Sequence, residues 1–485
     1  MQETAPESNA DSRRQAPGLN RRRVAVIGGG ISGLAAAHRL VTLDPTIELT
    51  LFESSDRLGG ILQTERRDGY LLERSADNFV TNVPGAVELC RELGIEGELL
   101  NTDAARRRAL VLRAGRLYPV PEGFQLMTPS QVLPLLKSPL LSWRGKLRAL
   151  GELWVAPRRV QADESLESFA VRRVGREAYE RLVQPLVAGI FTADPAKLSM
   201  RAALPKFFEQ EQHHGSLIRA ARKARGDEGA AQREASGARY SLFMAPRDGM
   251  GRIVAALAER LPTGSVRFNS RVSKLERRGT GWQITIGEAA PESFDGVIVA
   301  VGAPHAAKLL TSADAELAAD LGKIEYAGAT IAVGCYKLDQ IANPLNAFGF
   351  VVPDVERRDI LAASFSSRKF PGRAPEGCVI IRTFLGGALR PDLVDASDAD
   401  VGKIVSRELG EILGLRGEPH LWEIVRWNKA MPQYHLGHVE LVDRIEARAA
   451  TLPGLELAGN GYRGVGVPQC IRSGRAAAER TLSGN

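Results

Sequence analysis

The feature that most constrains this chain is a glycine motif between a strand and a helix near its start. The motif lies in "RVAVIGGGISGLAAAHRL", where an apolar strand pattern precedes the glycines and an alanine-rich helix pattern follows them. In GxGxxG the first glycine permits a tight turn, the second lets the backbone approach a pyrophosphate, and the third lets the helix pack on the strand. The helix N-terminus then binds the phosphates. The motif predicts a dinucleotide site lined by Gly28, Gly29, Gly30, Ile31, Ser32 and Gly33.

An acidic residue and a second glycine pair extend this site. The next strand pattern, "IELTLFE", ends at Glu53, at about the separation where a carboxylate meets ribose hydroxyls. Such a carboxylate would repel the 2′-phosphate of NADP. The following "ESSDRLGG" resembles the flavoprotein family that contains amine oxidases and porphyrinogen oxidases, where ExxxRxGG helps hold FAD. The resemblance adds Ser54, Arg57, Gly59 and Gly60. An NAD-binding Rossmann domain with a chance RxGG is the alternative.

A second glycine-rich helix start lies near the other end of the chain. The pattern "LELAGNGYRGVGVPQCIRSG" gives a strand, a glycine-rich turn and a helix. FAD is long, so its adenine and isoalloxazine ends need separate sites. We expect Val465, Gly466 and Val467 to face the flavin, where the helix dipole would stabilise negative charge on the reduced ring. A simple turn between strand and helix is the alternative.

A third segment is expected to complete the cofactor domain. "SVRFNSRVSKLE" and "WQITIG" alternate as strands do, and "FDGVIVAVGAPHAA" indicates a buried strand with a tight turn. In the family this segment brings a backbone contact to the adenine, here around Val272. The expected fold is therefore α/β, of the glutathione-reductase/amine-oxidase type. Its discontinuous FAD-binding domain comprises 21–88, 240–305 and 440–485.

The rest of the chain divides by pattern. Residues 89–220 have helical apolar spacing, whereas 306–439 alternate as a mixed sheet does and predict a substrate domain over the flavin. Residues 1–22 predict a disordered tail and 221–239 a flexible loop. The helical block contains "SQVLPLLKSPLLSWRGKLRALGELWV", in which Trp143, Trp154 and leucines alternate with basic residues. This mixture is compatible with a helix on a membrane surface, or with packing on the protein itself.

Composition excludes several classes of function. The net charge is +7, but the basic residues are scattered and match no nucleic-acid-binding module. The four cysteines form no CxxC pair, which argues against zinc and disulfides and favours a reducing cytosol. No metal site is predicted. The start of the chain lacks the apolar core of a secretory signal, and no apolar run is long enough to span a membrane. We expect a cytoplasmic protein, with at most peripheral contact at the inner face of the membrane.

Motifs along almost the whole chain resemble one family, the oxygen-dependent porphyrinogen oxidases of haem synthesis. They include "GYLLERSADNF", "LVQPLVAGIFTADPAKLSM", "SSRKFPGRAPEG" and "WNKAMPQYHLGH". The family implies that protoporphyrinogen IX or coproporphyrinogen III loses six electrons to FAD, and that O2 reoxidises the flavin to give peroxide. Hydride passes to flavin N5, so no catalytic acid or base is assigned. The next enzyme of haem synthesis is an expected partner, and the oligomeric state is left open.

The resemblance also assigns residues. It places Ser75, Ala76, Asp77, Asn78 and Trp427 near the flavin, and Phe348, Val351 and Phe370 in the substrate slot, although these apolar residues fit an ordinary sheet core equally well. No cysteine lies between Cys378 and Cys470, which favours non-covalent FAD.

One residue departs from the animal and plant protoporphyrinogen oxidases. Ala109 stands where they carry an arginine, which leaves the choice of porphyrinogen open, although the basic run Arg106 to Arg108 just before it is a candidate substitute. A flavin amine oxidase or desaturase, and a non-catalytic FAD-binding protein, remain alternatives.

Overall fold

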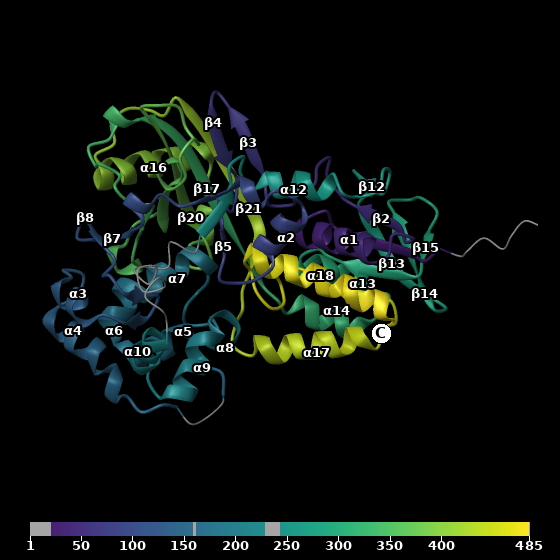
Figure 1. The fold of residues 1–485 in the computed structure, drawn as a ribbon, viewed down its shortest axis with the longest axis horizontal. Coiled ribbons are helices and arrows are strands. Elements are labelled where there is room, and N and C mark those ends of the chain that lie inside the picture. Colours follow the sequence, from purple (N-terminus) through teal and green to yellow (C-terminus); the bar gives the residue numbers. More distant parts are fainter. Residues whose placement is uncertain (1–20, 159–161, 228–242, 485) are drawn as a thin grey trace, which may run out of the picture.

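The computed structural model describes residues 21–158, 162–227 and 243–484. Figure 1 shows a parallel-sheet region on the right, a second sheet at the upper left and a helical region at the lower left. All but the last two residues of the expected disordered tail lie outside the described residues, as does 228–239 of the expected loop 221–239. The loop prediction is wrong for 221–227, which belong to α10 (Leu217–Asp227). Alanine, arginine and lysine dominate this stretch, and all three favour helix.

The parallel sheet draws its strands from three separate parts of the chain. Its order is β12-β2-β1-β16-β22, and every neighbouring pair is parallel. Because carboxyl ends of parallel strands lie at one edge, the loops that follow these strands open along the same edge. The strands are β1 (Arg23–Ile27), β2 (Glu48–Phe52), β12 (Val266–Arg267), β16 (Gly296–Val299) and β22 (Leu455–Leu457).

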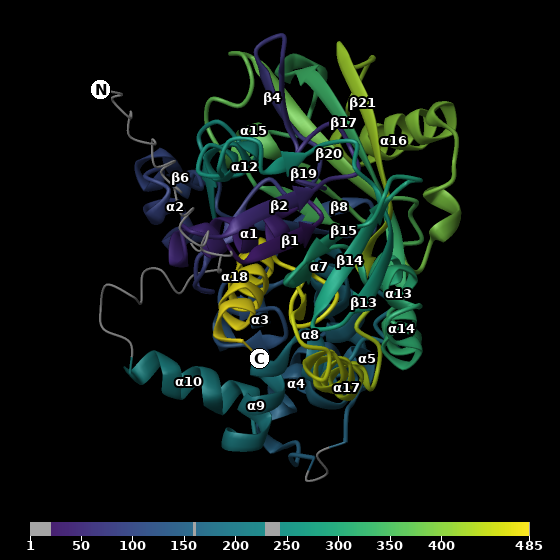
Figure 2. The ribbon, with the colours of Figure 1, turned by 90° about the vertical axis from the view of Figure 1, so that its right-hand side faces the viewer.

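Both faces of this sheet are covered, which explains its wholly apolar central strands. Val24 and Val26 pack in one core cluster, and Ala25 and Ile27 pack in another. Figure 2 shows α18 directly beside α1. The first face carries α1 (Ile31–Leu43), α2 (Ala86–Glu92), α12 (Gly251–Ala258) and α18 (Val467–Ser483). The second carries β13 (Val272–Arg278), β14 (Gly281–Ile286), β15 (Glu292–Phe294), α13 (Ala303–Leu310), α14 (Ala315–Gly322) and α17 (His438–Ala450).

A seven-stranded sheet, here called the roof, stands beside the parallel sheet. Its order is β21-β17-β20-β19-β18-β7-β8, antiparallel except for β18 and β7. Helix α16 (Asp398–Leu413) packs on one face of the roof. The strands are β7 (Ala109–Arg113), β8 (Arg116–Pro119), β17 (Tyr326–Lys337), β18 (Gly349–Val351), β19 (Ala362–Phe365), β20 (Cys378–Gly386) and β21 (Leu421–Pro432).

Two domain boundaries differ from the expected ones. Strands β7 and β8 lie in the block that was expected to be helical. β7 pairs with β18, a partner about 240 residues away, and local sequence patterns do not indicate so distant a pairing. Helices α13 and α14 fall largely within the expected substrate domain, yet their apolar faces pack against the parallel sheet, so they belong to the cofactor region.

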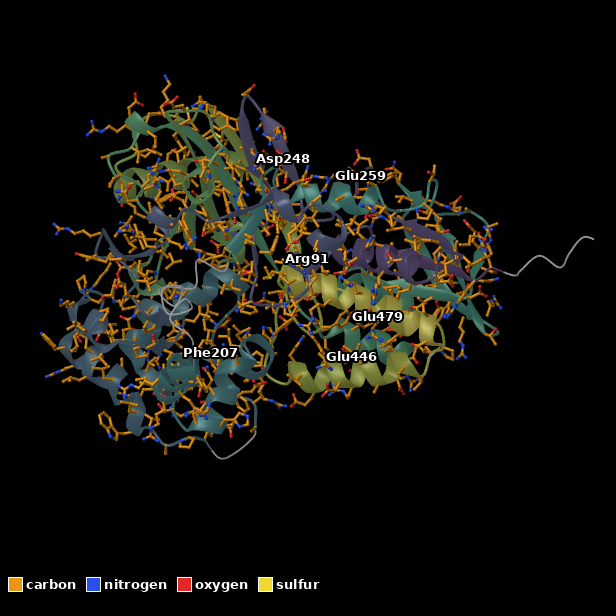
Figure 3. All side chains as sticks on the ribbon, in the orientation of Figure 1. Arg91, Phe207, Asp248, Glu259, Glu446 and Glu479 are labelled. Carbon is orange, nitrogen blue, oxygen red and sulfur yellow. The ribbon has the colours of Figure 1, made fainter. Side chains whose placement is uncertain are left out.

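The helical region packs around a buried polar network. The Arg173 side chain is fully buried and pairs with Glu152 and Glu211. Figure 3 labels Phe207 of α9 in this region, and Glu446 of α17 and Glu479 of α18 in the parallel-sheet region. The helices are α3 (Val132–Lys137), α4 (Trp143–Leu150), α5 (Leu166–Val174), α6 (Arg176–Ala178), α7 (Gln184–Phe191), α8 (Met200–Ala203), α9 (Pro205–His214) and α10, with a π-turn η4 (Tyr179–Val183) and a 3₁₀ turn η3 (Gly151–Trp154).

Three small sheets join these regions. The first is the hairpin of β3 (Thr64–Arg67) and β4 (Tyr70–Glu73), and the second pairs β9 (Phe124–Gln125) with β10 (Thr128–Pro129). The third has the order β5-β11-β6, with β5 (Phe79–Val80), β6 (Leu99–Asn101) and β11 (Phe243–Pro246). Within the described ranges, every helix is too short or too polar to cross a bilayer.

Candidate functional site

The first glycine loop forms an open cradle at the carboxyl edge of the parallel sheet. Gly28 has a φ of +106°, and a Cβ there would lie 2.7 Å from the Ala300 carbonyl oxygen. A Cβ on Gly33 would collide with the Gly28 carbonyl oxygen, so α1 can start this close to β1 only with glycine. At Gly30, by contrast, a Cβ would meet no described atom within 4 Å. The loop is therefore tight against the protein on one side and open on the other, as a phosphate cradle requires.

Glu53 lies at the end of β2 and faces this cradle. Its Oε2 accepts a hydrogen bond from the Gly29 N–H at 2.8 Å, and its Oε1 accepts one from the Ser55 N–H at 2.8 Å. The Ser54 and Ser55 hydroxyls donate to the same Oε1. The side chain is thus fixed beside the glycine loop, where a ribose is expected.

The RxGG segment is attached to the first glycine loop through its backbone. The Gly59 N–H donates to the Gly29 carbonyl at 2.8 Å, and Gly30 and Gly59 form a parallel bridge. The Arg57 guanidinium donates to the Gly60 carbonyl at 2.6 Å, which holds the turn in shape. The structure therefore brings together the two parts of the predicted cofactor motif.

The second glycine-rich turn opens at the same edge, because β22 is parallel to β16 in the same sheet. Tyr434 fixes this turn: its hydroxyl donates to the Asn460 carbonyl at 2.6 Å and accepts from the Gly464 N–H at 2.8 Å. The His438 ring stacks on the Tyr434 ring with centroids 4.0 Å apart, and burial lowers its pKa. Gly474 lets α18 contact the first turn of α1. The two glycine-rich helix starts are therefore neighbours in space.

The start of α18 is open to a ligand. Gly466 is its N-cap, and among the described side chains none caps it. Val465, Gly466 and Val467 are half-buried. The first-turn N–H groups are consequently available to a polar group, at the positive end of the helix dipole.

The predicted segment from Ser75 to Asn78 lies between α18 and the roof. Ala76 and Val467 pack against the same core cluster, and Arg382 of β20 donates to the Ser75 carbonyl. The Asn78 amide donates to the Asp77 carboxylate. Burial alone would raise the pKa of Asp77, but the positive charges of Lys369, Arg382 and Arg373 outweigh it and hold that pKa well below its usual range.

Two more predicted residues, Trp427 and Val272, lie in different parts of the structure. Trp427 is half-buried on β21, and its indole N–H donates to the Arg74 carbonyl at 2.6 Å. Val272 opens β13, two residues after Ser270, whose N–H donates to the Glu53 carbonyl at 2.8 Å. Trp427 therefore lies beside Arg74, the residue before Ser75, and Val272 lies near Glu53.

Register separates the roof residues into two faces. Val351, Ala362 and Phe384 lie in one row across β18, β19 and β20, and Arg382 shares their face. The alternate residues, such as Leu385 and Phe350, pack under α16. Because Arg382 reaches Ser75, the face with Val351 and Phe384 is directed towards the cofactor region.

The structure divides the three predicted substrate residues. Val351 is half-buried on the face directed towards the cofactor region, whereas Phe348 and Phe370 are only 5% and 0% exposed. Phe370 belongs to the core around α1 and α18, so it offers no surface to a substrate. Phe384 is not among the substrate residues predicted from the sequence, although the alternation of "CVIIRTFLGG" places it on the same face as Arg382.

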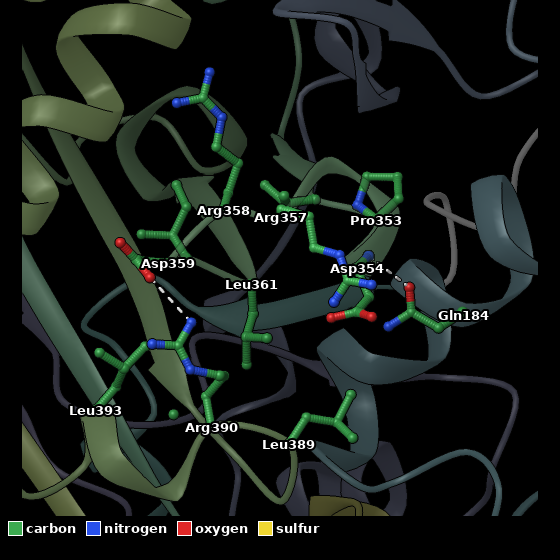
Figure 4. Close-up of a pocket in the computed structure, with 13 residues that line it drawn as sticks. Gln184, Pro353, Asp354, Arg357, Arg358, Asp359, Leu361, Leu389, Arg390 and Leu393 are labelled. Atoms are coloured by element: carbon green, nitrogen blue, oxygen red, sulfur yellow. Dashed lines mark hydrogen bonds and ion pairs between the residues drawn. The ribbon is translucent and has the colours of Figure 1, made fainter.

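Two clefts lie at the border between the roof and the helical region. Figure 4 shows the smaller, about 140 Å³, where Arg390 pairs with Asp359 and the Gln184 amide oxygen accepts from the Asp354 N–H. The larger, about 490 Å³, has walls from the roof and the helical region, including Tyr326 and Lys197. Its volume lies in the usual range for small-molecule sites. Neither contains a predicted site residue.

Comparisons with known proteins agree with this geometry. The model of the family "Flavin containing amine oxidoreductase" matches residues 31–482. The chain belongs to this family. It is 33% identical to the coproporphyrinogen III oxidase of Bacillus subtilis, over 96% of this chain and 98% of that protein. It is 30% identical to the mitochondrial protoporphyrinogen oxidase of Nicotiana tabacum, over 99% and 97%. A solved structure from Exiguobacterium, provisionally named protoporphyrinogen oxidase, has a TM-score of 0.84 at 27% identity, covering 96% of this chain and all of that one.

Membership of the flavin-containing amine oxidoreductases confirms the predicted fold class, the FAD cofactor and an oxidoreductase activity. The residues present also fit FAD. The cradle at Gly30 is open, and Ser75 Oγ and Gln469 Oε1 are buried without a hydrogen-bond partner in the part of the chain that the structure describes. Burial raises the pKa of the Cys470 thiol to about 11, so this thiol is poorly suited to form a covalent flavin link.

Proposed function

We propose that this flavin-containing oxidoreductase oxidises a porphyrinogen to the porphyrin, and that coproporphyrinogen III is its substrate. The observation that carries the proposal is the 33% identity to the Bacillus subtilis coproporphyrinogen III oxidase over nearly all of both chains. The full reaction removes six electrons and six protons and reduces three O2 to three H2O2. When bound, FAD supplies the two-electron acceptor and the reaction with oxygen.

The protein supplies binding and orientation in this proposal. Gly28 to Gly33, Glu53 and the RxGG turn hold the adenosine and phosphate end, and the uncapped start of α18 faces the flavin end. Val351 and Phe384 offer an apolar surface to a flat macrocycle. No side chain is assigned as a proton acceptor.

Ala109 favours coproporphyrinogen III over protoporphyrinogen IX only through resemblance, because the animal and plant protoporphyrinogen oxidases carry an arginine at this place. It pairs with Gly349 on the roof, so its small side chain lies in the sheet that is proposed to cover the substrate. The neighbouring arginines do not replace the missing charge. Arg107 donates to the Thr102 carbonyl at 3.0 Å, Arg106 pairs with Asp103, and Arg108 donates to the Ala105 carbonyl.

Anaerobic mixing with each porphyrinogen tests the substrate. Loss of the visible flavin absorbance should be faster with coproporphyrinogen III than with protoporphyrinogen IX. Phe384→Ala should slow this bleaching and leave the FAD content unchanged. Leu43→Ala, at a 44% exposed site at the end of α1 away from the glycine loop, should change neither the rate nor the FAD content. If neither porphyrinogen bleaches the flavin but an amine does, the protein is an amine oxidase. If no donor bleaches it, the protein binds FAD without catalysis.

We also propose that the helical region binds an anionic membrane surface peripherally. Trp143, Leu147 and Trp154 are 68%, 65% and 79% exposed, and Leu133 is 61% exposed. Trp143 and Leu147 are four residues apart on α4 and therefore share a face. Arg144, next to Trp143 on α4, and Lys137, at the end of α3, are also exposed, which places cations beside the apolar side chains. Figure 1 shows α3 and α4 at the outer edge of the molecule, far from α1.

Sedimentation with lipid vesicles tests this surface. Vesicles rich in phosphatidylserine should bind the holoenzyme more strongly than pure phosphatidylcholine vesicles, since the basic side chains add attraction to anionic lipids. Trp143→Ser with Trp154→Ser should weaken binding at least tenfold, and Phe268→Ser should not change it. Equal recovery of the double variant and wild type in the pellet would contradict the proposal.

A further inference from the structure

Five charged side chains meet in a buried cluster between the roof and the segment from Ser75 to Asn78. The Lys369 amine, at the end of α15 (Ser366–Lys369), lies 3.2 Å from an Asp77 carboxylate oxygen. Arg382 lies 3.5 Å from the same carboxylate, and Arg373 lies 4.0 Å from it and 3.7 Å from the Glu73 carboxylate. The side chains are between 1% and 12% exposed.

The cluster has one more cation than anions when all five groups are ionised. Two carboxylates, Glu73 and Asp77, face Lys369, Arg373 and Arg382. Arg373 Nη1 and Arg382 Nε are buried and have no hydrogen-bond partner among the residues that the structure describes. Burial lowers the pKa of the Lys369 amine, whereas the Asp77 carboxylate and the Phe370 ring, whose centre is 5.8 Å away, favour its charged form. An excess charge removed from water is costly unless another group compensates it.

The position of the cluster indicates which group would compensate it. Arg382 donates to the Ser75 carbonyl, and both Ala76 and Val467, which begins α18, pack against the same core cluster. The cluster therefore borders the place that the proposed function assigns to the isoalloxazine, and the inference rests on that assignment. FAD bound there would supply a two-electron acceptor, and its hydride-reduced form would carry one negative charge beside this cluster.

We propose that Lys369 is a positioning residue whose charge, within the Asp77 cluster, stabilises the reduced flavin and raises its two-electron reduction potential. The effect acts through space, together with the dipole of α18. A unit charge about 10 Å away at an effective dielectric constant of about 20 contributes roughly a tenfold change in an equilibrium.

The reduction potential of the bound FAD tests the proposal, measured by equilibration with a reference dye. In Lys369→Met the ratio of reduced to oxidised flavin at the wild-type midpoint should fall about tenfold, equivalent to about 30 mV for a two-electron couple. Lys369→Arg, which keeps the charge, should stay within about twofold. Lys323→Met is the matched control, because Lys323 pairs with Asp320 at an exposed site. FAD content and the thermal midpoint show that each variant is folded.

A double variant separates charge from structure. Lys369→Met with Asp77→Asn removes one charge of each sign and restores the single excess cation, so its potential should return towards the wild-type value. If Lys369 has only a structural role, adding Asp77→Asn should move the reduction potential further from the wild-type value. An unchanged potential in Lys369→Met, or a double variant no closer to wild type than the single one, would overturn the proposal.

The measurement is independent of the substrate. If wild-type flavin is not bleached by a porphyrinogen, the proposed function fails and the potential can still be measured. If bleaching proceeds but Lys369→Met changes only KM for the porphyrinogen and not the potential, this proposal fails, and Lys369 serves the substrate instead.

Discussion

The contact between α1 and α18 makes a quantitative prediction about cofactor binding. Gly474 lies about two turns into α18, and a Cβ there would lie 2.9 Å from the Ser32 carbonyl carbon, 3.1 Å from the Ala36 nitrogen and closer still to the Ser32 oxygen. All three atoms are backbone, so no flexible side chain can give way. Non-bonded heavy atoms pack best at about 3.5–4.0 Å, and the Ser32 oxygen is the closest of the three, so Gly474→Ala must separate the helices by roughly 1 Å or more. Such overpacking costs about 1–3 kcal/mol.

The cost should appear in FAD affinity, because both helix starts contribute to the proposed cofactor site. Gly402→Ala on α16 is the matched control, since a Cβ there meets no described atom within 4 Å. Both variants gain the same intrinsic helix propensity, about 0.5–1 kcal/mol, which cancels in the comparison. Titration of the two apoproteins with FAD should give a dissociation constant about 5- to 150-fold larger for Gly474→Ala. Constants within twofold of each other would refute the argument that this crossing sets the geometry of the site.

Three further predictions concern single side chains. Glu53→Gln should weaken FAD binding about tenfold in the same titration, because an amide cannot accept from two N–H groups on opposite oxygens and leaves one donor facing another. Arg173→Met should lower the unfolding free energy of the helical region by about 3–5 kcal/mol, measured by denaturant titration, because Glu152 would stay buried without its cation. The lowered pKa of His438 means that the unfolded chain binds a proton near pH 6.5 before the folded chain does. The thermal midpoint should therefore fall as pH decreases through that range, and less so in His438→Gln.

The proposed cofactor half of the site rests on local patterns. The apolar run before Gly28, the acidic residue at the end of the next strand and the glycine-rich turn before Val467 each lie within one strand–loop–helix unit. Each unit also carries its own physical reason, namely a positive φ, a close approach or a helix dipole. The parallel sheet then places these units at one edge without further information from the sequence.

The substrate half depends on contacts between distant segments. Phe370 and Val351 are both apolar residues in strand-like sequence patterns. Phe370 lies in the core around α1, whereas Val351 lies on the face of the roof directed towards the cofactor region. The pairing of β7 with β18 decides where Ala109 lies, and it joins residues about 240 positions apart. The Asp77 cluster similarly joins residues about 290 positions apart, so no local pattern indicates it.

The closeness of the two helix starts implies that the two ends of FAD do not bind independently. Gly474 fixes the position of α18 on the first turn of α1, and Tyr434 fixes the turn before α18 to the end of β21. A phosphate held at α1 therefore places the flavin end at α18 at almost no further entropic cost, because the second site is already oriented. A substitution at either helix start should then weaken the binding of both ends of FAD. For this reason Gly474, which contacts the first turn of α1, is expected to matter for FAD binding as much as Glu53, which is proposed to contact the ribose.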